Sequence, residues 1–244
     1  MREGSSGMKA SREGKSGGVE RDVAMALIVL NIFVFLVEPG VRDAAHGIFE
    51  RRYSLSVAGL RAGYWWQFVT FQFLHGNWLH LVTNLVLLHS MGPVLETTLG
   101  RRRFLLLYMG SGVVGGLAHA GASLAWPARF GTPVVGASAG LCGLLAALGY
   151  LYADDRVRGL FLFVIPFEVK AKVLLFLAGL VSMVGTVLPF GRVAHFAHLG
   201  GLVGGLMVLQ LMRIKAMPAE SRKDGAVSGA AGKEGGAGVA SEGP

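Results

Sequence analysis

Long apolar runs alternate with short polar segments along most of the chain. A helix needs about 20 mostly apolar residues to cross the roughly 30 Å hydrocarbon core of a bilayer. Six runs meet or approach that length, and we predict a membrane-spanning helix in each: residues 22–38, 78–95, 104–125, 135–153, 169–188 and 194–213. The pattern predicts an all-α, polytopic membrane protein built as a bundle of six transmembrane helices. The expected partner of this bundle is the lipid bilayer.

The segments outside these runs divide the chain into three parts. Residues 1–21 and 214–244 are rich in Gly, Ala, Ser and charged residues and hold no aromatic residue, which predicts disordered tails. Residues 22–213 form the membrane domain. Within it, residues 39–77 are amphipathic and carry a group of aromatic residues typical of a membrane–water interface: Tyr64, Trp65, Trp66 and Phe68.

Charge and composition set the orientation and exclude some partners. The mean hydropathy is +0.53 and the formal net charge is +8. Lys and Arg gather in the two tails, at Arg101–Arg103 and over 154–172, so the positive-inside rule predicts that both termini are cytoplasmic. The basic residues are not interleaved with aromatic residues, so no nucleic-acid partner is expected. No organelle-targeting segment precedes the first run, which favours the plasma (inner) membrane of a prokaryote.

Strongly polar side chains inside the apolar runs mark a candidate site, because they are costly in lipid and by default face the bundle interior. Ser138 lies near the start of the fourth run and His198 near the start of the sixth. His80 and Asn84 lie four residues apart, on one face of the second run. With both termini cytoplasmic, these four residues share the extracytoplasmic half of the membrane. His75 lies in the loop just before the second run, where it can pack the loop or support the site.

This set of residue types is suited to nucleophilic catalysis. A serine nucleophile needs a base within hydrogen-bonding reach and donors that stabilise the oxyanion. No Asp lies in the interior of an apolar run, since Asp22 stands at the very start of the first one, so the arrangement that remains is a Ser-His dyad of Ser138 and His198 rather than a triad. Backbone N–H groups at the start of the fourth helix, together with the side chains of His80 and Asn84, are candidate oxyanion donors.

Glycines explain how the serine and the histidine could meet. Pairs of small residues four apart let helix backbones approach closely in lipid. Gly136 and Gly140 have this spacing in the fourth run, and Gly201 and Gly205 have it in the sixth. We expect these two helices to pack closely and to bring the two catalytic candidates together.

Four motifs, in this order, resemble those of the rhomboid intramembrane serine proteases, over roughly residues 22–213. They are WWQFVTFQFLHGNWLHLVTN for the family's outer loop and HxxxxHxxxN region, GPVLETTLG for GxxxExxxG, GASAG for GxSG, and AHLGGLVGG for AHxxGxxxG. Each motif alone is weakly specific, but the four together on these runs are specific. The resemblance implies a six-helix bundle around a short fourth helix, open to a water-filled cavity on the outer side.

The resemblance also implies a role for each matching residue. Ser138 would be the nucleophile and His198 the general base and acid of a serine endopeptidase. His80 and Asn84 would support the oxyanion, with Gly136 needed beside it.

By the same matching, Glu96 would tie the inner end of the second span to its neighbours. Substrates would be membrane proteins, admitted where the second and fifth spans part and cleaved near the outer end of their helix. Residues 188–194 would lie over the cavity as a cap. No metal, nucleotide or other cofactor is implied.

Three positions depart from the family's pattern. Ala139 stands where the family usually has Gly after the nucleophile, and Cys142 stands where it tends to place an aromatic ring against the catalytic His. Gln67 follows Trp66 in place of an Arg, which removes a cation that would anchor the outer loop. We expect close packing to persist at Ala139 and the dyad to be held less rigidly.

Two other function classes stay open. A catalytically inactive rhomboid-like protein would bind membrane clients without cutting them, although such relatives typically lose the Ser or the His that this chain retains. A metal or ion carrier would use the histidines, but transport usually involves intramembrane carboxylates that the runs lack. The histidines concerned are His75, His80, His89, His119, His195 and His198. Loss of substrate cleavage in Ser138→Ala would distinguish a protease from both classes.

Overall fold

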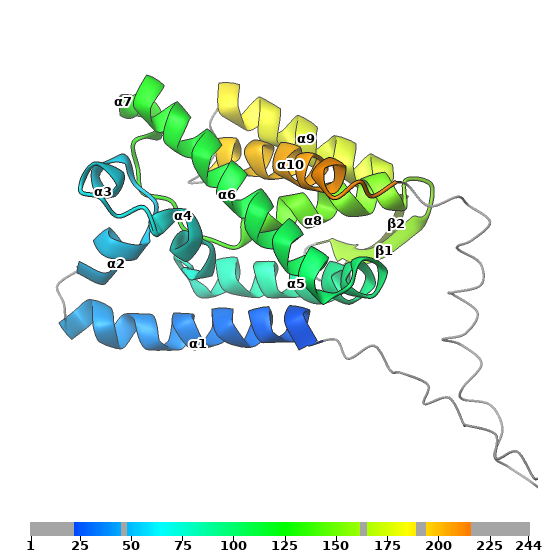
Figure 1. The fold of residues 1–244 in the computed structure, drawn as a ribbon, viewed down its shortest axis with the longest axis horizontal. Helices are drawn as coiled ribbons and strands as arrows, with labels where there is room; N and C mark the ends of the chain where they lie inside the picture. Colours follow the sequence, from blue (N-terminus) through cyan, green and yellow to red (C-terminus); the bar gives the residue numbers. More distant parts are fainter. Residues whose placement is uncertain (1–21, 45–47, 162–164, 189–193, 216–244) are drawn as a thin grey trace, which may run out of the picture.

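A computed structural model describes residues 22–44, 48–161, 165–188 and 194–215, so both predicted tails lie outside the described part. Helices make up most of it, and most of the long ones run along the long axis of the molecule (Figure 1). The long helices are α1 (Asp22–Ala44), α5 (Trp78–Leu99), α6 (Arg101–Ala125), α8 (Ser138–Leu151), α9 (Ala171–Val187) and α10 (His195–Leu211). Each predicted apolar run coincides with one of these helices.

Two helices in the described part, α5 and α6, are long and apolar enough to cross a membrane on their own. The apolar stretches of the other four are shorter: Val23–Val37, Ser138–Leu151, Ala171–Val187 and His195–Leu211. The helical character of the six runs is confirmed, whereas the count of six full spans is not. The fourth is the shortest, because 14 residues at a rise of 1.5 Å extend only about 21 Å.

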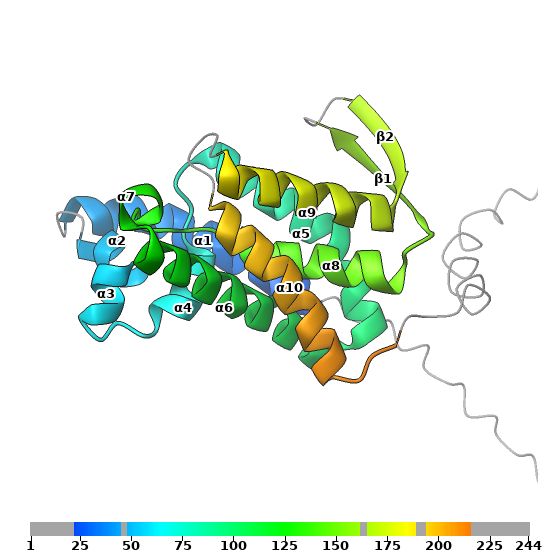
Figure 2. The ribbon, with the colours of Figure 1, turned by 90° about the horizontal axis from the view of Figure 1, so that it is seen from above.

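Close helix packing at glycines brings α6, α8 and α10 together, each in contact with the other two (Figure 2). A Cβ added at Gly201 would overlap the carbonyl oxygen of Ala139, and one added at Gly205 would lie 2.5 Å from the carbonyl oxygen of Gly143. On the side facing α6, a Cβ at Gly204 would lie 2.8 Å from Cβ of Val114. The predicted contact of α8 with α10 through Gly201 and Gly205 is therefore present, but the predicted pair on the other helix is wrong: Gly136 precedes α8, and Gly140 faces Tyr108 of α6.

The all-α prediction is wrong between α8 and α9. An antiparallel hairpin of β1 (Arg156–Phe161) and β2 (Ile165–Lys170) occupies this region, and α9 begins at Ala171 rather than at residue 169. The amino-acid sequence explains the strands. RVRGLF and IPFEVK contain Val, Ile and Phe, which favour strands, and Pro166 disfavours a helix interior.

Short helices connect α1 to α5 at one end of the bundle. They are α2 (Ile48–Tyr53), α3 (Val57–Arg61), α4 (Gln67–Thr70) and the 3₁₀ helix η1 (Phe71–Phe73), and α7 (Pro127–Phe130) follows α6 at the same end (Figure 1). This region is the amphipathic segment that the sequence analysis assigned to the interface.

Glu96 fastens α1 to the opposite end of α5. Its side chain is fully buried, and its two carboxylate oxygens accept hydrogen bonds from the backbone N–H groups of Val23 (3.0 Å) and Ala24 (2.9 Å). A carboxylate at a helix N-terminus satisfies N–H groups that have no partner within the helix. The predicted tie between the inner end of this span and its neighbour is thus present, and the neighbour is α1.

Candidate active site

The start of α8 is fixed by an extended segment that precedes it. Val134 pairs with Leu55 through two backbone hydrogen bonds, of 3.0 and 2.9 Å, and the N–H of Gly136 donates to the carbonyl oxygen of Phe71 at 2.8 Å. These contacts hold the segment against the connection between α1 and α5. Ser138 is the first residue of α8 and is half-buried.

Ser138 and His198 are in direct contact. The Nε2 atom of His198 lies 2.7 Å from Oγ of Ser138, although 60 residues separate the two in sequence. The contact follows from the glycine packing, because Gly201 lies one turn beyond His198 on α10 and presses against the backbone of Ala139. A hydroxyl hydrogen-bonded to an imidazole nitrogen is the geometry in which a histidine can take up a serine proton.

Gly136 and His80 adjoin the serine on its other side. Gly136 has a φ of +128°, which L side chains rarely adopt. A Cβ at this position would lie 2.7 Å from the imidazole of His80 and 3.7 Å from Oγ of Ser138. Gly136 is therefore required both by its backbone conformation and by the closeness of His80, and the imidazole of His80 lies beside the serine.

Asn84 and His75 surround His80. Asn84 is buried one helical turn further along α5, and its Nδ2 has no hydrogen-bond partner in the described part of the chain. His75 is 1% exposed, and its ring meets that of His80 edge-on with centroids 5.1 Å apart. Burial, with a smaller effect from His80, lowers the pKa of His75 to about 4. His75 is therefore neutral at ordinary pH and can support the orientation of His80 through ring contact.

The departures at Ala139 and Cys142 differ in their surroundings. Ala139 is buried between α6 and α10, and a Cβ at Gly115 would lie 2.8 Å from the Cβ of Ala139. Ala139 lies inside a helix and needs no unusual backbone conformation, so one methyl group fits and the predicted close packing persists. Cys142 is a free, half-buried cysteine one turn beyond Ser138. Nothing in the structure tests whether it loosens the dyad.

Gln67 takes over the anchoring that the missing cation was expected to provide. Its side chain is fully buried, Oε1 accepts a hydrogen bond from the N–H of Ser56 at 3.1 Å, and Nε2 donates to the carbonyl oxygen of Arg51 at 2.9 Å. A Cβ at Gly59 would overlap the same amide. A neutral amide therefore joins α2, α3 and α4, and the lost charge does not leave the outer loop unanchored.

Two neighbours of Gln67 extend this arrangement. Nε1 of Trp66 donates to the carbonyl oxygen of Arg52 at 2.9 Å, and Oγ1 of Thr70 donates to that of Tyr53 at 2.8 Å. The last carbonyl groups of a helix have no hydrogen-bond partner within it. At the end of α2, the side chains of Trp66, Gln67 and Thr70 provide these partners. The sequence analysis missed this role, which only the polar spacing of Trp66, Gln67 and Thr70 could have indicated.

The predicted cap lies between the end of α9 and the start of α10, and His195 is the first residue of α10. Residues 189–193 of the cap lie outside the described part. His195 is buried, its ring centroid lies 6.3 Å from that of His198, and a Cβ at Gly185 would overlap its ring. His195 thus packs α10 against α9 beside the site. In the described residues, no group of three or more His, Cys, Asp or Glu side chains could hold a metal ion, so the metal-carrier hypothesis gains no support.

The chain resembles known proteins over the region that holds these residues. The family model described as "Rhomboid domain" matches residues 62–215. The chain is 31% identical over 165 residues to the rhomboid protein YdcA of Bacillus subtilis, which covers 64% of this chain and 70% of that protein. It is 34% identical to mitochondrial rhomboid protein 1 of Saccharomyces cerevisiae over 55% of this chain and 38% of the relative.

A third relative is the rhomboid protease GluP of Bacillus subtilis, 31% identical over 59% of this chain and 25% of that protein. The chain thus spans well under half of the last two relatives and most of the first. The family match covers α4 through α10, including every candidate catalytic residue. The chain belongs to the rhomboid family of integral membrane proteins.

Proposed function

We propose that this protein is an intramembrane serine endopeptidase that cleaves membrane proteins with a Ser-His dyad. The single observation that carries the proposal is the 2.7 Å contact between Oγ of Ser138 and Nε2 of His198 at the start of a short, buried helix. A serine in a membrane helix commonly serves only as a hydrogen-bonding group between helices. A serine at a helix N-terminus, bonded to a histidine and flanked by a second histidine and a strained glycine, has the parts that acyl transfer needs.

In the proposed reaction, Ser138 attacks the scissile carbonyl carbon while Nε2 of His198 takes the hydroxyl proton. The oxyanion that forms lies near Gly136, where backbone N–H groups at the start of α8 and the side chains of His80 and Asn84 stabilise it. His198 then gives its proton to the leaving amine, which departs with the C-terminal part of the substrate. Water, activated by the same histidine, hydrolyses the acyl-enzyme and restores the serine.

The orientation follows from the distribution of basic residues. Lys and Arg favour the side at which α1 begins and α10 ends, so both termini are cytoplasmic and α8 begins on the extracytoplasmic side. Cleavage then occurs near the extracytoplasmic end of the substrate helix, which enters where α5 and α9 part. The substrate must unwind locally at the scissile bond, so Gly or Pro near that bond favours cleavage. A bacterial plasma membrane stays our preferred location, although the relatives include a mitochondrial protein.

Covalent labelling tests the proposal directly. A fluorophosphonate should label the purified wild type at Ser138, label Ser138→Ala not at all, and label His198→Ala far more slowly, because the serine then lacks its base. The matched control is Ser182→Ala, which removes a buried membrane serine of α9 outside the site. If wild type and Ser138→Ala are equally unlabelled while both remain folded, the protein is a client-binding relative without protease activity.

A model single-span substrate completes the test. Mass spectrometry of the released fragments should find products with wild type and none with Ser138→Ala, and their ends should lie near the extracytoplasmic end of the substrate helix. Cleavage near the cytoplasmic end would contradict the proposed orientation but not the proposed dyad.

A further inference from the structure

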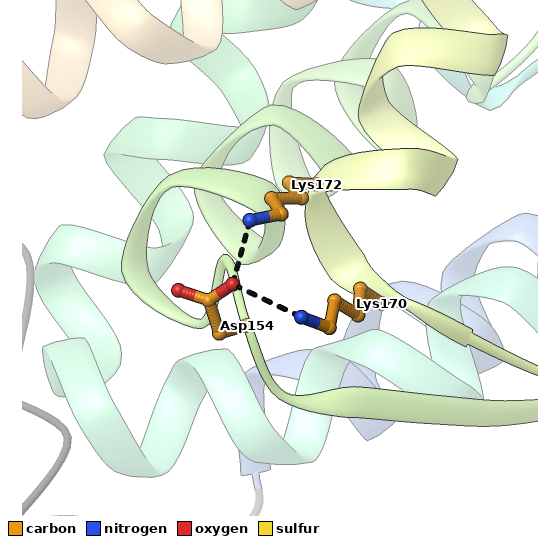
Figure 3. A network of polar contacts seen from close by, with 3 residues as sticks. All are labelled: Asp154, Lys170 and Lys172. Carbon is orange, nitrogen blue, oxygen red and sulfur yellow. Dashed lines mark hydrogen bonds and ion pairs between the residues drawn. The ribbon is translucent and has the colours of Figure 1, made fainter.

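The two ends of α9 are held to the bundle in different ways. In the first turn, Ala171 is fully buried, and its backbone N–H donates to the carbonyl oxygen of Asp155 at 2.9 Å. The carboxylate of Asp154 lies 2.6 Å from Nζ of Lys172 and 3.6 Å from Nζ of Lys170 (Figure 3). These contacts join the first turn of α9 to the segment that follows α8.

Close packing against α8 also fixes the start of α9. A Cβ added at Gly149 would lie 2.6 Å from Cβ of Leu175, so the two helices approach closely there. Beyond this point most of the large apolar side chains of α9 are exposed, among them Phe176, Met183 and Val187. The start of α9 is therefore fixed, whereas the rest of the helix contacts the bundle through few side chains.

An arginine of α7 contacts the other end of α9. Nη2 of Arg129 donates a hydrogen bond to the carbonyl oxygen of Val187, the last residue of α9, although 58 residues separate the two in sequence. The end of α9 lies on the side of the molecule that carries α7 (Figures 1 and 2). The last carbonyl groups of a helix have no partner within it and carry a partial negative charge, so a cation stabilises this end.

The arginine projects from a well-fixed helix. Cζ of Arg129 lies 5.2 Å from the ring centroid of Phe130, and that ring meets the ring of Phe196 on α10 edge-on, with centroids 5.0 Å apart. Oγ of Ser123 on α6 donates to the carbonyl oxygen of Phe130 at 2.6 Å. Because α7 is joined to α6 and α10, the helices that pack with α8 at glycines, Arg129 links the end of α9 to the most tightly packed part of the bundle.

We propose that Arg129 restrains the end of α9 and so limits how often the route between α5 and α9 opens to a membrane-protein substrate. This inference rests on the proposed function, in which a substrate helix enters where these two helices part. The restrained end lies beside the dyad, because Gly185 packs against His195, whose ring lies 6.3 Å from that of His198. Arg129 is thus a positioning residue, which acts on the substrate only through α9.

Distances between spin labels test the restraint without relying on protease activity. The protein carries Ser138→Ala, so that it cannot cleave, and Cys142→Ala, so that nitroxides attach only at introduced cysteines. The first pair of labels is placed at Leu79→Cys and Met183→Cys, two exposed positions near the start of α5 and the end of α9. Distances are measured in nanodiscs by double electron–electron resonance.

A second pair of labels reports on the opposite end of the same two helices. It is placed at Val94→Cys and Val173→Cys, which are also exposed. In Arg129→Ala, the population at long distance should rise several-fold for the first pair and stay unchanged for the second, because only the end of α9 is released.

Two further variants separate the contact from the charge. Arg129→Lys keeps the charge but offers a flexible ammonium group in place of the planar guanidinium, so it should give an intermediate change. Arg61→Ala removes an exposed arginine of α3, at the same end of the bundle, and should change neither pair.

The effect on access is measured in protein that retains Ser138. Arg129→Ala should raise kcat/KM for a model single-span substrate several-fold, whereas the rate of fluorophosphonate labelling should match that of wild type, because the small probe does not need α9 to move. If wild type cleaves nothing, the proposed function and the role in access are both overturned, and the distances still decide whether Arg129 restrains α9.

Three results would overturn the inference. Unchanged distances for the first pair in Arg129→Ala would mean that other contacts hold the end of α9. Equal lengthening of both pairs, with slower labelling, would mean that Arg129 supports the whole fold. Longer distances for the first pair without faster cleavage would refute the role of Arg129 in substrate access.

Discussion

The helices α9 and α10 have the same length of 17 residues and both contact α8, but they pack in opposite ways. In α10 the buried residues include four glycines, Gly200, Gly201, Gly204 and Gly205. In α9 the buried residues are Ala171, Ser182 and Gly185, and most of its large apolar side chains are exposed. One helix is fitted to its neighbours backbone against backbone, and the other mainly to lipid.

This difference matches the roles that we propose for the two helices. A dyad needs its two members held within a few tenths of an ångström, and close backbone packing supplies that because few side-chain rotamers intervene. A helix that parts from the bundle to admit a substrate must instead make few specific contacts. We therefore propose that the glycine face of α10 serves catalysis and that the apolar surface of α9 serves substrate access.

The sharpest way to break the comparison is one methyl group on each helix. In Gly201→Ala the added Cβ overlaps the carbonyl oxygen of Ala139, and neither backbone can move far. We expect the free energy of unfolding to fall by about 3 kcal/mol and fluorophosphonate labelling to be nearly lost. Both are measured on the purified protein, the first by equilibrium unfolding.

The matched control is Gly179→Ala on α9. A Cβ there meets only Cδ1 of Leu202, at 4.0 Å, which is ordinary contact. Stability and labelling should stay close to wild type. Equal losses of stability and labelling in the two variants would mean that the effect does not come from the close approach of α10 to α8.

A second prediction extends the comparison to the start of α8. Gly136→Ala puts a side chain at a φ of +128° and a Cβ 2.7 Å from the imidazole of His80. We expect kcat/KM to fall about a hundredfold or more, as when an oxyanion donor is displaced, with a smaller loss of stability than in Gly201→Ala. Activity on a model substrate and thermal unfolding of the same preparation check the split. A variant that keeps full activity would remove Gly136 and His80 from the proposed oxyanion site.

The sequence predicted the tightly packed half of the molecule better than the rest. The spacing of Gly201 and Gly205 on α10, with polar residues at the starts of two apolar runs, was enough to predict the close contact and the meeting of Ser138 with His198. The spacing of small residues predicts such contacts well, because only small residues such as Gly let two helix backbones approach closely in lipid. The tie of Glu96 to α1 came from the family resemblance alone.

The parts that were missed depend on contacts between backbone and side chain or on local strand pairing. The role of Gln67 rests on carbonyl and N–H groups of α2 and α3, whose positions no sequence spacing reveals. The hairpin was not predicted, because its strands are short and β2 leads directly into the apolar helix α9. Whether four short helices span the membrane depends on the local thickness of the bilayer and on their tilt, which hydropathy does not specify.

A third prediction probes a close contact between α9 and α10. In Gly185→Ala the added Cβ overlaps the ring of His195, but a side chain can shift where a backbone cannot. We expect a loss of about 1 kcal/mol in the free energy of unfolding. Labelling by the small fluorophosphonate should stay within a few-fold of wild type, whereas cleavage of a helical substrate should change more, because the outer end of α9 has moved. Equal effects on probe and substrate would mean that this contact serves the dyad rather than access.

The smallest effect is expected at the exposed base of α9. The hydrogen bond and charge of Lys172, followed by Lys170, hold the pKa of Asp154 below its ordinary value of 3.8. A carboxyl with a lowered pKa stabilises the fold above its unfolded pKa, and this contribution is lost as the pH falls through the folded pKa. Asp154→Asn should therefore lower the thermal midpoint only slightly at neutral pH, because both lysines are solvated and salt screens the pairs. The difference from wild type should shrink in high salt and vanish in strongly acidic buffer, where the wild-type carboxyl is protonated as well. A difference that persists unchanged in acid would mean that the effect of the substitution does not depend on the charge of Asp154.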